Sequence, residues 1–283
     1  MKILLTGASG QVGYELERAL QSLGEVVAVD RARMDLADLQ QVRSVVREVR
    51  PNLIVNPAAY TAVDKAESEP TLARTINALA PAVLAEEAKA LGAAMVQYST
   101  DYVFDGTKVG AYLETDEPNP LGVYGKTKLE GEQAVVAAGI PHLILRTSWV
   151  YGMRGKNFLL TMLRLARERD ELRVVDDQHG APTWSRTIAD TTALLLAQAK
   201  QDDWSDSHSG IYHLSARGQT TWCGFTRAIV ENASLDCRIV PITSAEYPMA
   251  APRPGNSVMS AAKLTEQLAV LPDWRKALDL CMR

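Results

Sequence analysis

The sequence is poor in the residues from which disulfide frameworks and metal sites are built. Its 283 residues include only three cysteines, Cys223, Cys237 and Cys281, an odd number at spacings that match no zinc signature. The four histidines are scattered along the chain and belong to no Ser/His/Asp or metal-ligand pattern. We therefore expect three reduced, buried thiols and no histidine-based catalysis, which fits a reducing compartment.

The sequence also lacks a strong charge of one sign and any long apolar run. Lysine and arginine number 30 against 34 aspartate and glutamate, a net charge of −4, with the two signs interspersed. Nucleic acid is therefore not an expected partner. No stretch approaches the roughly 20 apolar residues that span a bilayer, and the N-terminus does not have the pattern of a signal peptide. These absences predict a cytoplasmic protein with no membrane partner.

What the sequence does have is a regular alternation of elements over its first 150 residues. Short β-branched runs, typical of strands, alternate with amphipathic stretches of helical period. The predicted strands are Lys2–Thr6, Val26–Val29, Leu53–Val55, Ala94–Tyr98 and His142–Arg146, and the predicted helices are Gln11–Ser22, Leu39–Val49, Pro70–Leu91 and Val123–Ala138. Strands joined by crossover helices pair in parallel, which predicts an α/β fold with a doubly wound, Rossmann-like sheet.

A glycine-rich turn follows the first predicted strand and opens the first helix. Its residues Gly7, Gly10 and Gly13 have the spacing GxxGxxG. Gly7 permits a tight turn, Gly10 lets a pyrophosphate approach the backbone, and Gly13 lets the helix pack closely on the strand. The start of the helix, at Gln11 and Val12, then presents N–H groups to phosphates. In this strand–turn–helix context the motif predicts a dinucleotide cofactor.

The residues after the second predicted strand leave the choice of cofactor open. Asp30 stands where an acid binds the adenine ribose hydroxyls, which favours NAD. Arg31 and Arg33 follow at once, and a pairing of either with a 2′-phosphate favours NADP. Asp35 and Leu36 are expected to flank the adenine. These signals conflict, so NADPH and NADH both stay open as the cofactor, with NADPH placed first.

The second half of the chain shows a looser pattern. Phe158–Glu168 and Ile188–Ala199 are expected to be helices, and Arg173–Val175 and Ile211–His213 short strands. We expect residues 1–150 to form the dinucleotide-binding domain. Residues 151–283 are then a smaller, partly discontinuous substrate lobe, with segments that return to the first domain.

Tyr124 and Lys128 lie four residues apart, on one face of a predicted helix. Reduction of a ketone needs a proton donor for the oxygen that gains negative charge. A nearby ammonium and an oxidised nicotinamide both favour tyrosinate, so we expect the pKa of Tyr124 to fall from near 10 towards about 7. The YxxxK pattern is weak by itself, but together with the glycine-rich turn it predicts a catalytic pair.

A polar segment at the carboxyl end of the fourth predicted strand supplies a third catalytic group. Ligand sites of open α/β sheets lie at this edge. Thr100 is the expected hydrogen-bonding partner of the substrate carbonyl, with Ser99 as the alternative. Neighbours in a strand point to opposite faces, so the two side chains are not expected to serve equally. Asp101 is expected to bind a substrate hydroxyl or to tune nearby pKa values.

Longer stretches of the sequence carry a resemblance to a known family. They are residues 56–67 (NPAAYTAVDKAE), 99–104 (STDYVF), 123–129 (VYGKTKL), 146–151 (RTSWVY) and 253–257 (RPGNS). With the glycine-rich turn, they resemble the extended short-chain dehydrogenase/reductase superfamily and, within it, the dTDP-4-dehydrorhamnose reductase family, over nearly the whole chain. The resemblance implies reduction of the C4 ketone of dTDP-4-dehydro-β-L-rhamnose to dTDP-L-rhamnose by NADPH or NADH.

The resemblance also implies roles for individual residues. Tyr124 is the implied proton donor and Lys128 its partner. The implied substrate contacts are Thr100, Asp101, Trp149 (packed on the sugar), Asn157 and Arg253 (at a nucleotide phosphate). The implied cofactor contacts are Gly10, Gln11 and Val12 at the pyrophosphate, Asp30 at the ribose, and Ala58, Ala59, Tyr60, Thr61 and Tyr98 beside the cofactor. Trp184, Trp204, Trp222 and Trp274 belong to no motif and are expected only to pack in the interior.

Some members of that family bind Mg²⁺ at a dimer interface through acidic side chains. Glu15 matches such a position, but Asp190 stands where a longer glutamate is common, and no third ligand is identifiable. A hard cation takes several oxygen ligands. We therefore assign no metal ligand, and leave open both Mg²⁺ and the choice between monomer and homodimer.

Two other functions stay open at this point. An epimerase or dehydratase of another nucleotide sugar shares the Tyr/Lys core but needs further acid/base groups. A dehydratase has an acid pair after the threonine, whereas here Asp101 is followed by Tyr102. A non-catalytic regulatory subunit keeps the fold and the cofactor site, but the intact Thr100, Tyr124 and Lys128 argue against it.

Overall fold

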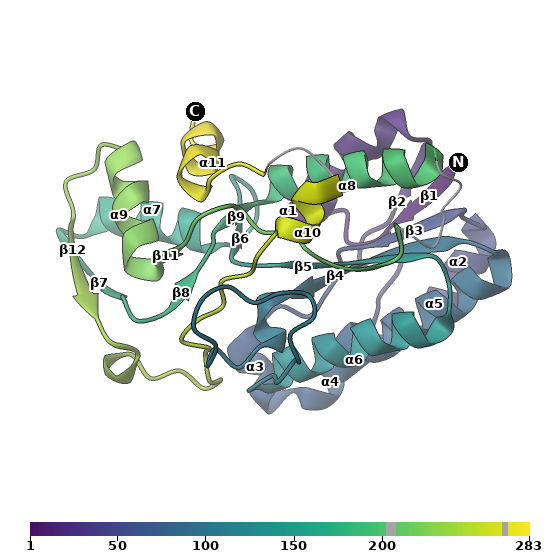
Figure 1. Cartoon of the computed structure of the whole chain (residues 1–283), viewed down its shortest axis with the longest axis horizontal. Coiled ribbons are helices and arrows are strands. Elements are labelled where there is room, and N and C mark those ends of the chain that lie inside the picture. Colours follow the sequence, from purple (N-terminus) through teal and green to yellow (C-terminus); the bar gives the residue numbers. More distant parts are fainter. Residues whose placement is uncertain (202–207, 268–270) are drawn as a thin grey trace.

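Six parallel strands form the central sheet of the computed structural model, which describes residues 1–201, 208–267 and 271–283 (Figure 1). In spatial order they are β10 (Gly210–His213), β5 (His142–Thr147), β4 (Ala94–Thr100), β3 (Leu53–Asn56), β1 (Lys2–Leu5) and β2 (Glu25–Ala28). All neighbouring pairs are parallel, so the predicted α/β class and doubly wound sheet are confirmed. The winding reverses between β1 and β3, the point at which such sheets bind ligands.

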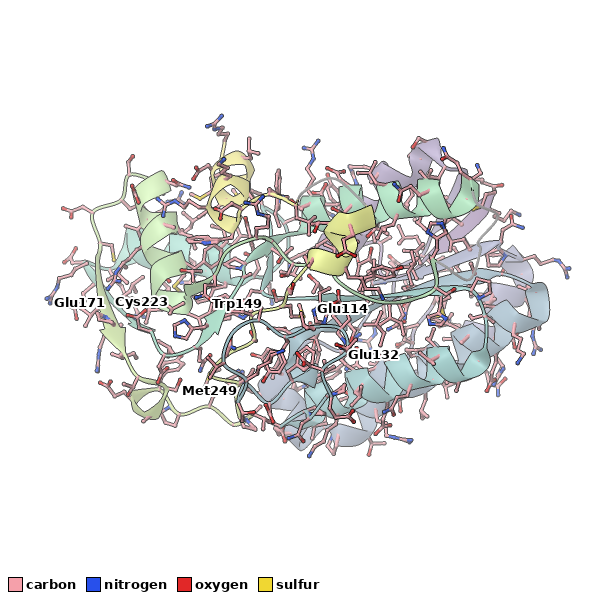
Figure 2. The ribbon with its side chains drawn as sticks, viewed as in Figure 1. Glu114, Glu132, Trp149, Glu171, Cys223 and Met249 are labelled. Carbon is pink, nitrogen blue, oxygen red and sulfur yellow. The ribbon has the colours of Figure 1, made fainter. Side chains whose placement is uncertain are left out.

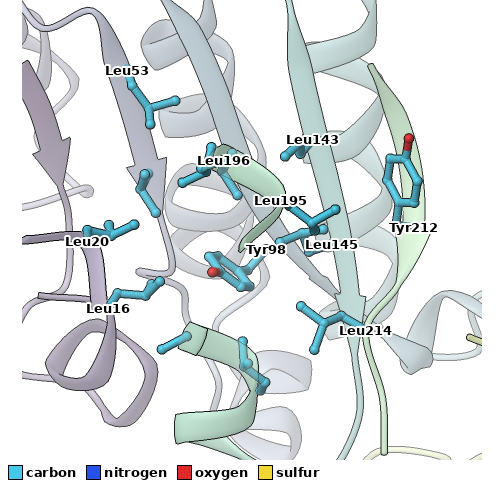
Figure 3. Packing of buried hydrophobic residues seen from close by; sticks show 14 of the residues in the cluster. Leu16, Leu20, Leu53, Tyr98, Leu143, Leu145, Leu195, Leu196, Tyr212 and Leu214 are labelled. Carbon is cyan, nitrogen blue, oxygen red and sulfur yellow. The ribbon is translucent and has the colours of Figure 1, made fainter. Parts of the chain in front are cut away.

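Helices cover both faces of this sheet. One face carries α1 (Gln11–Ala19), α8 (Ser185–Gln201) and α10 (Ala262–Gln267), and the other carries α2 (Leu39–Val49), α5 (Ala80–Leu91) and α6 (Val123–Ala138). Because side chains alternate along a strand, Ile3 and Leu5 pack in the first core and Leu4 packs in the second. Figure 3 shows part of the first core, in which Leu16 and Leu20 pack near Leu53 and Leu196. No helix in the described ranges is both long and apolar enough to cross a membrane.

Helix α2 shows how the local sequence sets an element. Asp38 precedes it, and its carboxylate accepts hydrogen bonds from the amides of Gln40 and Gln41, both at 3.0 Å. Such a cap satisfies amides that the first turn of a helix leaves free. Val42 and Val46, four residues apart, are fully buried against the sheet. The cap and the apolar spacing together explain why the predicted and observed bounds agree.

A second lobe continues from one end of the sheet, at the left of Figure 1. Its elements are β6 (Val150–Tyr151), α7 (Phe158–Glu168), β7 (Glu171–Val175), β8 (His179–Gly180), β9 (Thr183–Trp184), β11 (Thr220–Thr221), α9 (Trp222–Asn232), β12 (Arg238–Ile242) and α11 (Trp274–Cys281). The pattern of the sequence predicted only α7 and part of β7 among these. All three cysteines are free thiols buried in the core of this lobe. Trp204 lies outside the described residues.

The chain returns from the second lobe to the sheet through α8 and β10. Helix α8 packs along α1, and it begins at Ser185, three residues before the predicted start. Strand β10 pairs in parallel with β5, with Ile211 opposite Ile144. Segments after residue 151 therefore complete one core and one edge of the sheet.

The segment Pro70–Leu91, predicted as one helix, is broken by a turn of π-helix. It consists of α4 (Pro70–Arg74), the π-helix η2 (Thr75–Leu79) and α5. The amide of Ala80 bonds to the carbonyl of Thr75, five residues back. Pro81 has no N–H to donate, so the α-helical ladder is interrupted here. A short helix that was not predicted, α3 (Val63–Ser68), precedes this segment.

Gly131→Ala tests how closely α6 packs on η2. A Cβ at this position would lie 2.2 Å from the carbonyl oxygen of Asn77, so α6 would have to move away. We expect the free energy of unfolding to fall by about 1–3 kcal/mol in urea denaturation. The matched control is Gln133→Ala, on the exposed face of the same helix, with an expected change below about 0.5 kcal/mol. Equal stability of Gly131→Ala and wild type would contradict the packing.

Candidate active site

A cavity of about 640 Å³ lies at the carboxyl ends of the central strands, beside the point where the winding reverses. The glycine-rich turn after β1, residues 57–62 after β3, and one face of α6 contribute to its walls. Every residue predicted to contact the cofactor lines this cavity except Asp30 and Arg33, the second candidate for a 2′-phosphate, which pairs with Glu48 instead. Lining residues that the sequence did not single out for the cofactor are Ser9, Met34, Pro57, Ala62, Ile76, Ser99, Thr147, Val150, Gly155 and Lys156.

The geometry of the glycine-rich turn fits an anionic dinucleotide. Gly7 has φ +58°, a conformation that side chains disfavour, and a Cβ at Gly13 would lie 2.1 Å from the carbonyl oxygen of Gly7. Helix α1 can therefore start directly against the turn. Gly10 precedes its first residue, Gln11, with no side-chain cap. The first amides of α1 are then available to phosphate oxygens.

The residues predicted to select between NAD and NADP lie in different places: Arg31 lines the cavity and Asp30 does not. Asp30 is exposed, and its carboxylate accepts hydrogen bonds from the amides of Ala32 (3.0 Å) and Arg33 (3.3 Å), which caps the following turn. Arg31 lines the cavity and forms an ion pair with Asp35 at 3.1 Å. The pKa of Asp35 is lowered, chiefly because its carboxylate accepts a hydrogen bond from the amide of Ala37. At the point where Asp30 favoured NAD and Arg31 favoured NADP, the side chain at the cavity wall is thus the guanidinium of Arg31.

Lys128 is buried and ties α6 to the sheet. Its Nζ donates a hydrogen bond to the carbonyl oxygen of Tyr98 in β4, at 2.6 Å. Burial lowers the pKa of Lys128 to about 8, because the ammonium loses its hydration. The hydroxyl of Tyr98 pairs with that of Thr192 in α8 at 2.7 Å. Tyr98 of β4 is therefore bound by α6 on one face of the sheet and by α8 on the other.

The expectation that Lys128 lowers the pKa of Tyr124 is wrong in this structure. The pKa of Tyr124 is raised to about 12, first because burial disfavours the phenolate, while the Thr100 hydroxyl opposes this shift and Asp101 adds to it. The ammonium of Lys128 is held by the Tyr98 carbonyl instead. Tyr124 consequently keeps its proton at neutral pH, as a proton donor must.

Thr100 lies beside Tyr124, and Ser99 faces the cavity. The hydroxyl of Thr100 donates to Asp101 Oδ1 at 3.0 Å and accepts from the amide of Tyr102 at 3.2 Å. Ser99 lines the cavity, and its buried hydroxyl has no hydrogen-bond partner in the described part of the protein. Burial raises the pKa of Asp101 to about 6, against the opposing hydroxyls of Ser257 and Thr100. Tyr124, Thr100 and Asp101 thus form one polar group, in which Thr100 and Asp101 are buried and the half-buried Tyr124 lines the cavity.

A buried ion pair lies behind this group. Arg146 of β5 donates from Nε and Nη2 to the two carboxylate oxygens of Glu132, at 2.9 and 2.7 Å. Both side chains are at most 2% exposed. Glu132, labelled in Figure 2, follows Lys128 by one helical turn and raises the pKa of that lysine, against the effect of burial. No local pattern in the sequence pointed to this pair.

Asn77 is a second residue that joins elements of the site without being part of any sequence motif. It lies in the π-helix η2, where its Oδ1 accepts from the amide of Tyr60 at 2.8 Å. Its Nδ2 donates to the carbonyl of Tyr60 at 3.1 Å and to the hydroxyl of Thr127 at 3.2 Å. One side chain therefore fixes the loop after β3 to the helix that carries Tyr124. The segment Pro70–Leu91 holds several other polar residues, Arg74 and Thr75 among them, so no local signal set Asn77 apart.

Trp149 is held by the second lobe in a strained conformation. Its backbone has φ +46°, which is unusual for a bulky residue. Its indole stacks on Trp222 of α9, with ring centroids 3.5 Å apart and an angle of 7° between the planes. Gly180 leaves room for it, since a Cβ there would lie 2.4 Å from Cε2 of the indole. Figure 2 shows Trp149 near the middle of the molecule, between the sheet and the second lobe.

None of the five predicted substrate contacts lines the cavity, neither Thr100, Asp101 and Trp149 nor Asn157 and Arg253. Arg253 forms an ion pair with Asp64 of α3 at 2.8 Å, and its side chain is 12% exposed. Asn157 caps α7 by accepting from the amide of Leu160, and its Nδ2 donates to Gln11 Oε1 at 2.8 Å. Both side chains join segments that are far apart in the sequence.

Glu15 and Asp190 lie on the two helices, α1 and α8, that pack together. Asp190 is 3.8 Å from Arg186. Within residues 1–201, 208–267 and 271–283, no three acidic, histidine or cysteine side chains gather in an arrangement suited to a metal ion.

Comparisons with known proteins cover the whole chain. The family model described as RmlD substrate binding domain matches residues 1–283. The dTDP-4-dehydrorhamnose reductase of Burkholderia thailandensis is 50% identical over 293 residues, covering 100% of this chain and 98% of that protein. A solved dTDP-4-dehydrorhamnose reductase from Clostridium acetobutylicum has a TM-score of 0.92 at 38% identity, covering 100% and 98% of the two chains. Another, from Bacillus anthracis in complex with NADP, has a TM-score of 0.90 at 35% identity, covering 99% and 98%.

Glu132→Gln tests the buried ion pair. The variant leaves the Arg146 guanidinium buried without its carboxylate, so we expect the free energy of unfolding to fall by about 3–5 kcal/mol in urea denaturation. Glu130→Gln is the matched control, because Glu130 lies on the same helix and pairs with Arg74 at the surface. Its loss should be no more than about 1 kcal/mol. Losses of similar size in the two variants would contradict a special role for burial.

Proposed function

The chain belongs to the dTDP-4-dehydrorhamnose reductase family, and from this we propose that it reduces the C4 ketone of dTDP-4-dehydro-β-L-rhamnose to dTDP-L-rhamnose. The chain is an oxidoreductase that uses a nicotinamide cofactor. The observation that carries the proposal is that Tyr124 and Lys128 line the same cavity as the glycine-rich turn, with Thr100 beside the phenol of Tyr124. No described feature favours an epimerase, a dehydratase or a regulatory subunit over this function.

NADPH is the proposed cofactor, and NADH is the alternative. The glycine-rich turn and the first amides of α1 hold the pyrophosphate, and the loop after β3 flanks the cofactor. Arg31 lines the cavity near the adenine end, where a guanidinium suits a 2′-phosphate. Asp30, which caps a turn, is not placed to exclude that phosphate. When bound, the cofactor supplies the hydride to C4.

Tyr124 is the proposed proton donor to the oxygen at C4. Its raised pKa keeps the phenol protonated until the ketone oxygen gains charge. Thr100 lies beside the phenol, and its hydroxyl proton is donated to Asp101 at 3.0 Å. When the ketone is bound, this hydroxyl turns from Asp101 and donates its proton to the same oxygen, so that Thr100 and Tyr124 stabilise the developing alkoxide together. Lys128 supplies a buried positive charge on the same helix face and holds the nicotinamide ribose.

The substrate contacts are proposed at the border between the sheet and the second lobe. Trp149 packs on the sugar, in the orientation that Trp222 and Gly180 enforce. Arg253 approaches the nucleotide phosphates from a site where it already pairs with Asp64. Asn157 contributes through the loop that it holds, because its amide is used within the protein.

Tyr124→Phe tests the proton donor. Removing one hydroxyl deletes the acid, so we expect kcat for NADPH oxidation with dTDP-4-dehydro-β-L-rhamnose to fall by roughly 10²- to 10⁴-fold. NADPH binding, measured by fluorescence titration, should stay close to that of wild type. Turnover near the wild-type level would contradict the role of Tyr124. The absence of turnover by pure, folded wild-type protein would sink the proposed function itself.

The pH dependence of kcat/KM for NADPH tests the charge on Lys128. Burial disfavours the ammonium, so this lysine loses its proton at a lower pH than an exposed one, with a pKa of about 8. We expect kcat/KM to fall as the pH rises through about 8, since this parameter reports groups of the free enzyme. Lys128→Arg, which stays charged, should remove the fall even if its maximum rate is lower. A wild-type profile that is flat to pH 9.5 would contradict the role of this charge.

A further inference from the structure

A loop of the second lobe lies across the glycine-rich turn. This bridging loop, residues 152–157, connects β6 to α7. Asn157 Nδ2 donates to Gln11 Oε1 at 2.8 Å, and also to the carbonyls of Gly152 (2.8 Å) and Arg154 (3.2 Å). One amide therefore closes the loop on itself and fastens it to the first residue of α1.

Two further contacts hold the bridging loop against α1. The guanidinium of Arg154 lies 4.0 Å from the ring centroid of Tyr14, one turn into that helix. Gly155 has φ +77°, and a Cβ there would lie 3.3 Å from Cγ of Gln11. The loop thus approaches the helix start so closely that glycine is the residue best suited to this position.

Lys156 lies between Gly155 and Asn157, which both contact Gln11, and it lines the cofactor cavity. Its side chain is exposed, and its ammonium makes no ion pair or hydrogen bond within the described ranges. The other two lining cations already have partners: Arg31 is paired with Asp35, and Lys128 donates to the Tyr98 carbonyl. Lys156 is therefore the lining cation that is free to meet an anion near Gly10 and Gln11.

We propose that Lys156 binds the pyrophosphate of the nicotinamide dinucleotide. The proposal rests on the cofactor that the proposed function requires, and it adds a ligand from the second lobe to a site otherwise built by the first. The amides of the α1 N-terminus approach the phosphates from one side, and the ammonium of Lys156 neutralises charge from the side of the bridging loop. Cofactor binding thereby strengthens the junction between the lobes.

Lys156→Gln tests this proposal through binding alone. Dissociation constants for NADPH and NADH are measured by fluorescence titration, without sugar substrate. We expect both to rise by about tenfold, a factor that corresponds to about 1.4 kcal/mol. The difference from wild type should shrink as salt is raised, because the lost attraction is exposed and screened. Lys156→Arg should keep most of the affinity.

Lys126→Gln is the matched control, since it removes the same charge from an exposed site on α6 that does not line the cavity. Its dissociation constants should match those of wild type. Unchanged affinity in Lys156→Gln would overturn the proposal. A loss confined to NADPH would also overturn it, because it would place the lysine at the 2′-phosphate. Failure of the wild type to bind either dinucleotide would instead contradict the proposed function.

Discussion

Helix α6 packs on the turn after β4 and on the π-helix η2 more closely than a helix with ordinary side chains on that face could. Two glycines make this possible, because a Cβ at Gly125 would lie 2.1 Å from the carbonyl of Tyr102 and one at Gly131 would lie 2.2 Å from that of Asn77. At that distance Lys128 reaches the Tyr98 carbonyl and Glu132 reaches Arg146. Tyr124, Lys128 and Glu132 are spaced one turn apart, so a single helix face places donor, cation and ion pair in one row.

The same close packing determines the electrostatics of the site. Burial raises the pKa of Tyr124 and lowers that of Lys128, because both charged forms lose hydration. Burial therefore favours the neutral phenol of Tyr124 and the neutral amine of Lys128. The position of Lys128 is fixed by its hydrogen bond to the Tyr98 carbonyl and not by a charge on Tyr124. Glu132 opposes this trend for Lys128. An anionic ligand entering the cavity would favour the ammonium further, which makes cofactor binding and the charge of the lysine mutually supportive.

The second lobe takes part in the site through several contacts. Trp222 and Gly180 set the orientation of Trp149, and the bridging loop fastens Gln11 through Asn157. Strand β10 and helix α8 extend the sheet and its core from the same half of the chain. The proposed site therefore lies on a junction rather than within one domain, and each lobe presents its residues from elements that the other lobe holds in place.

Local signals in the sequence were enough for the sheet, the glycine-rich turn and the Tyr124–Lys128 spacing, since each depends on residues within a few positions of one another. They were not enough for the short elements of the second lobe, whose strands are two residues long in several cases. The prediction for the pKa of Tyr124 failed because it considered a neighbouring charge and not burial, which depends on how α6 and β4 pack.

By itself, then, the sequence determined the α/β class, the dinucleotide turn and the pair of side chains on α6. Only the tertiary structure decided that Asn77 fixes the loop after β3, that Glu132 meets Arg146, and that Lys156 faces the cavity. Partners such as Asn77 and Thr127 are 50 residues apart in the chain. No periodicity or local propensity records such a contact, because it exists only when the packed helices and strands bring the two side chains within hydrogen-bonding distance.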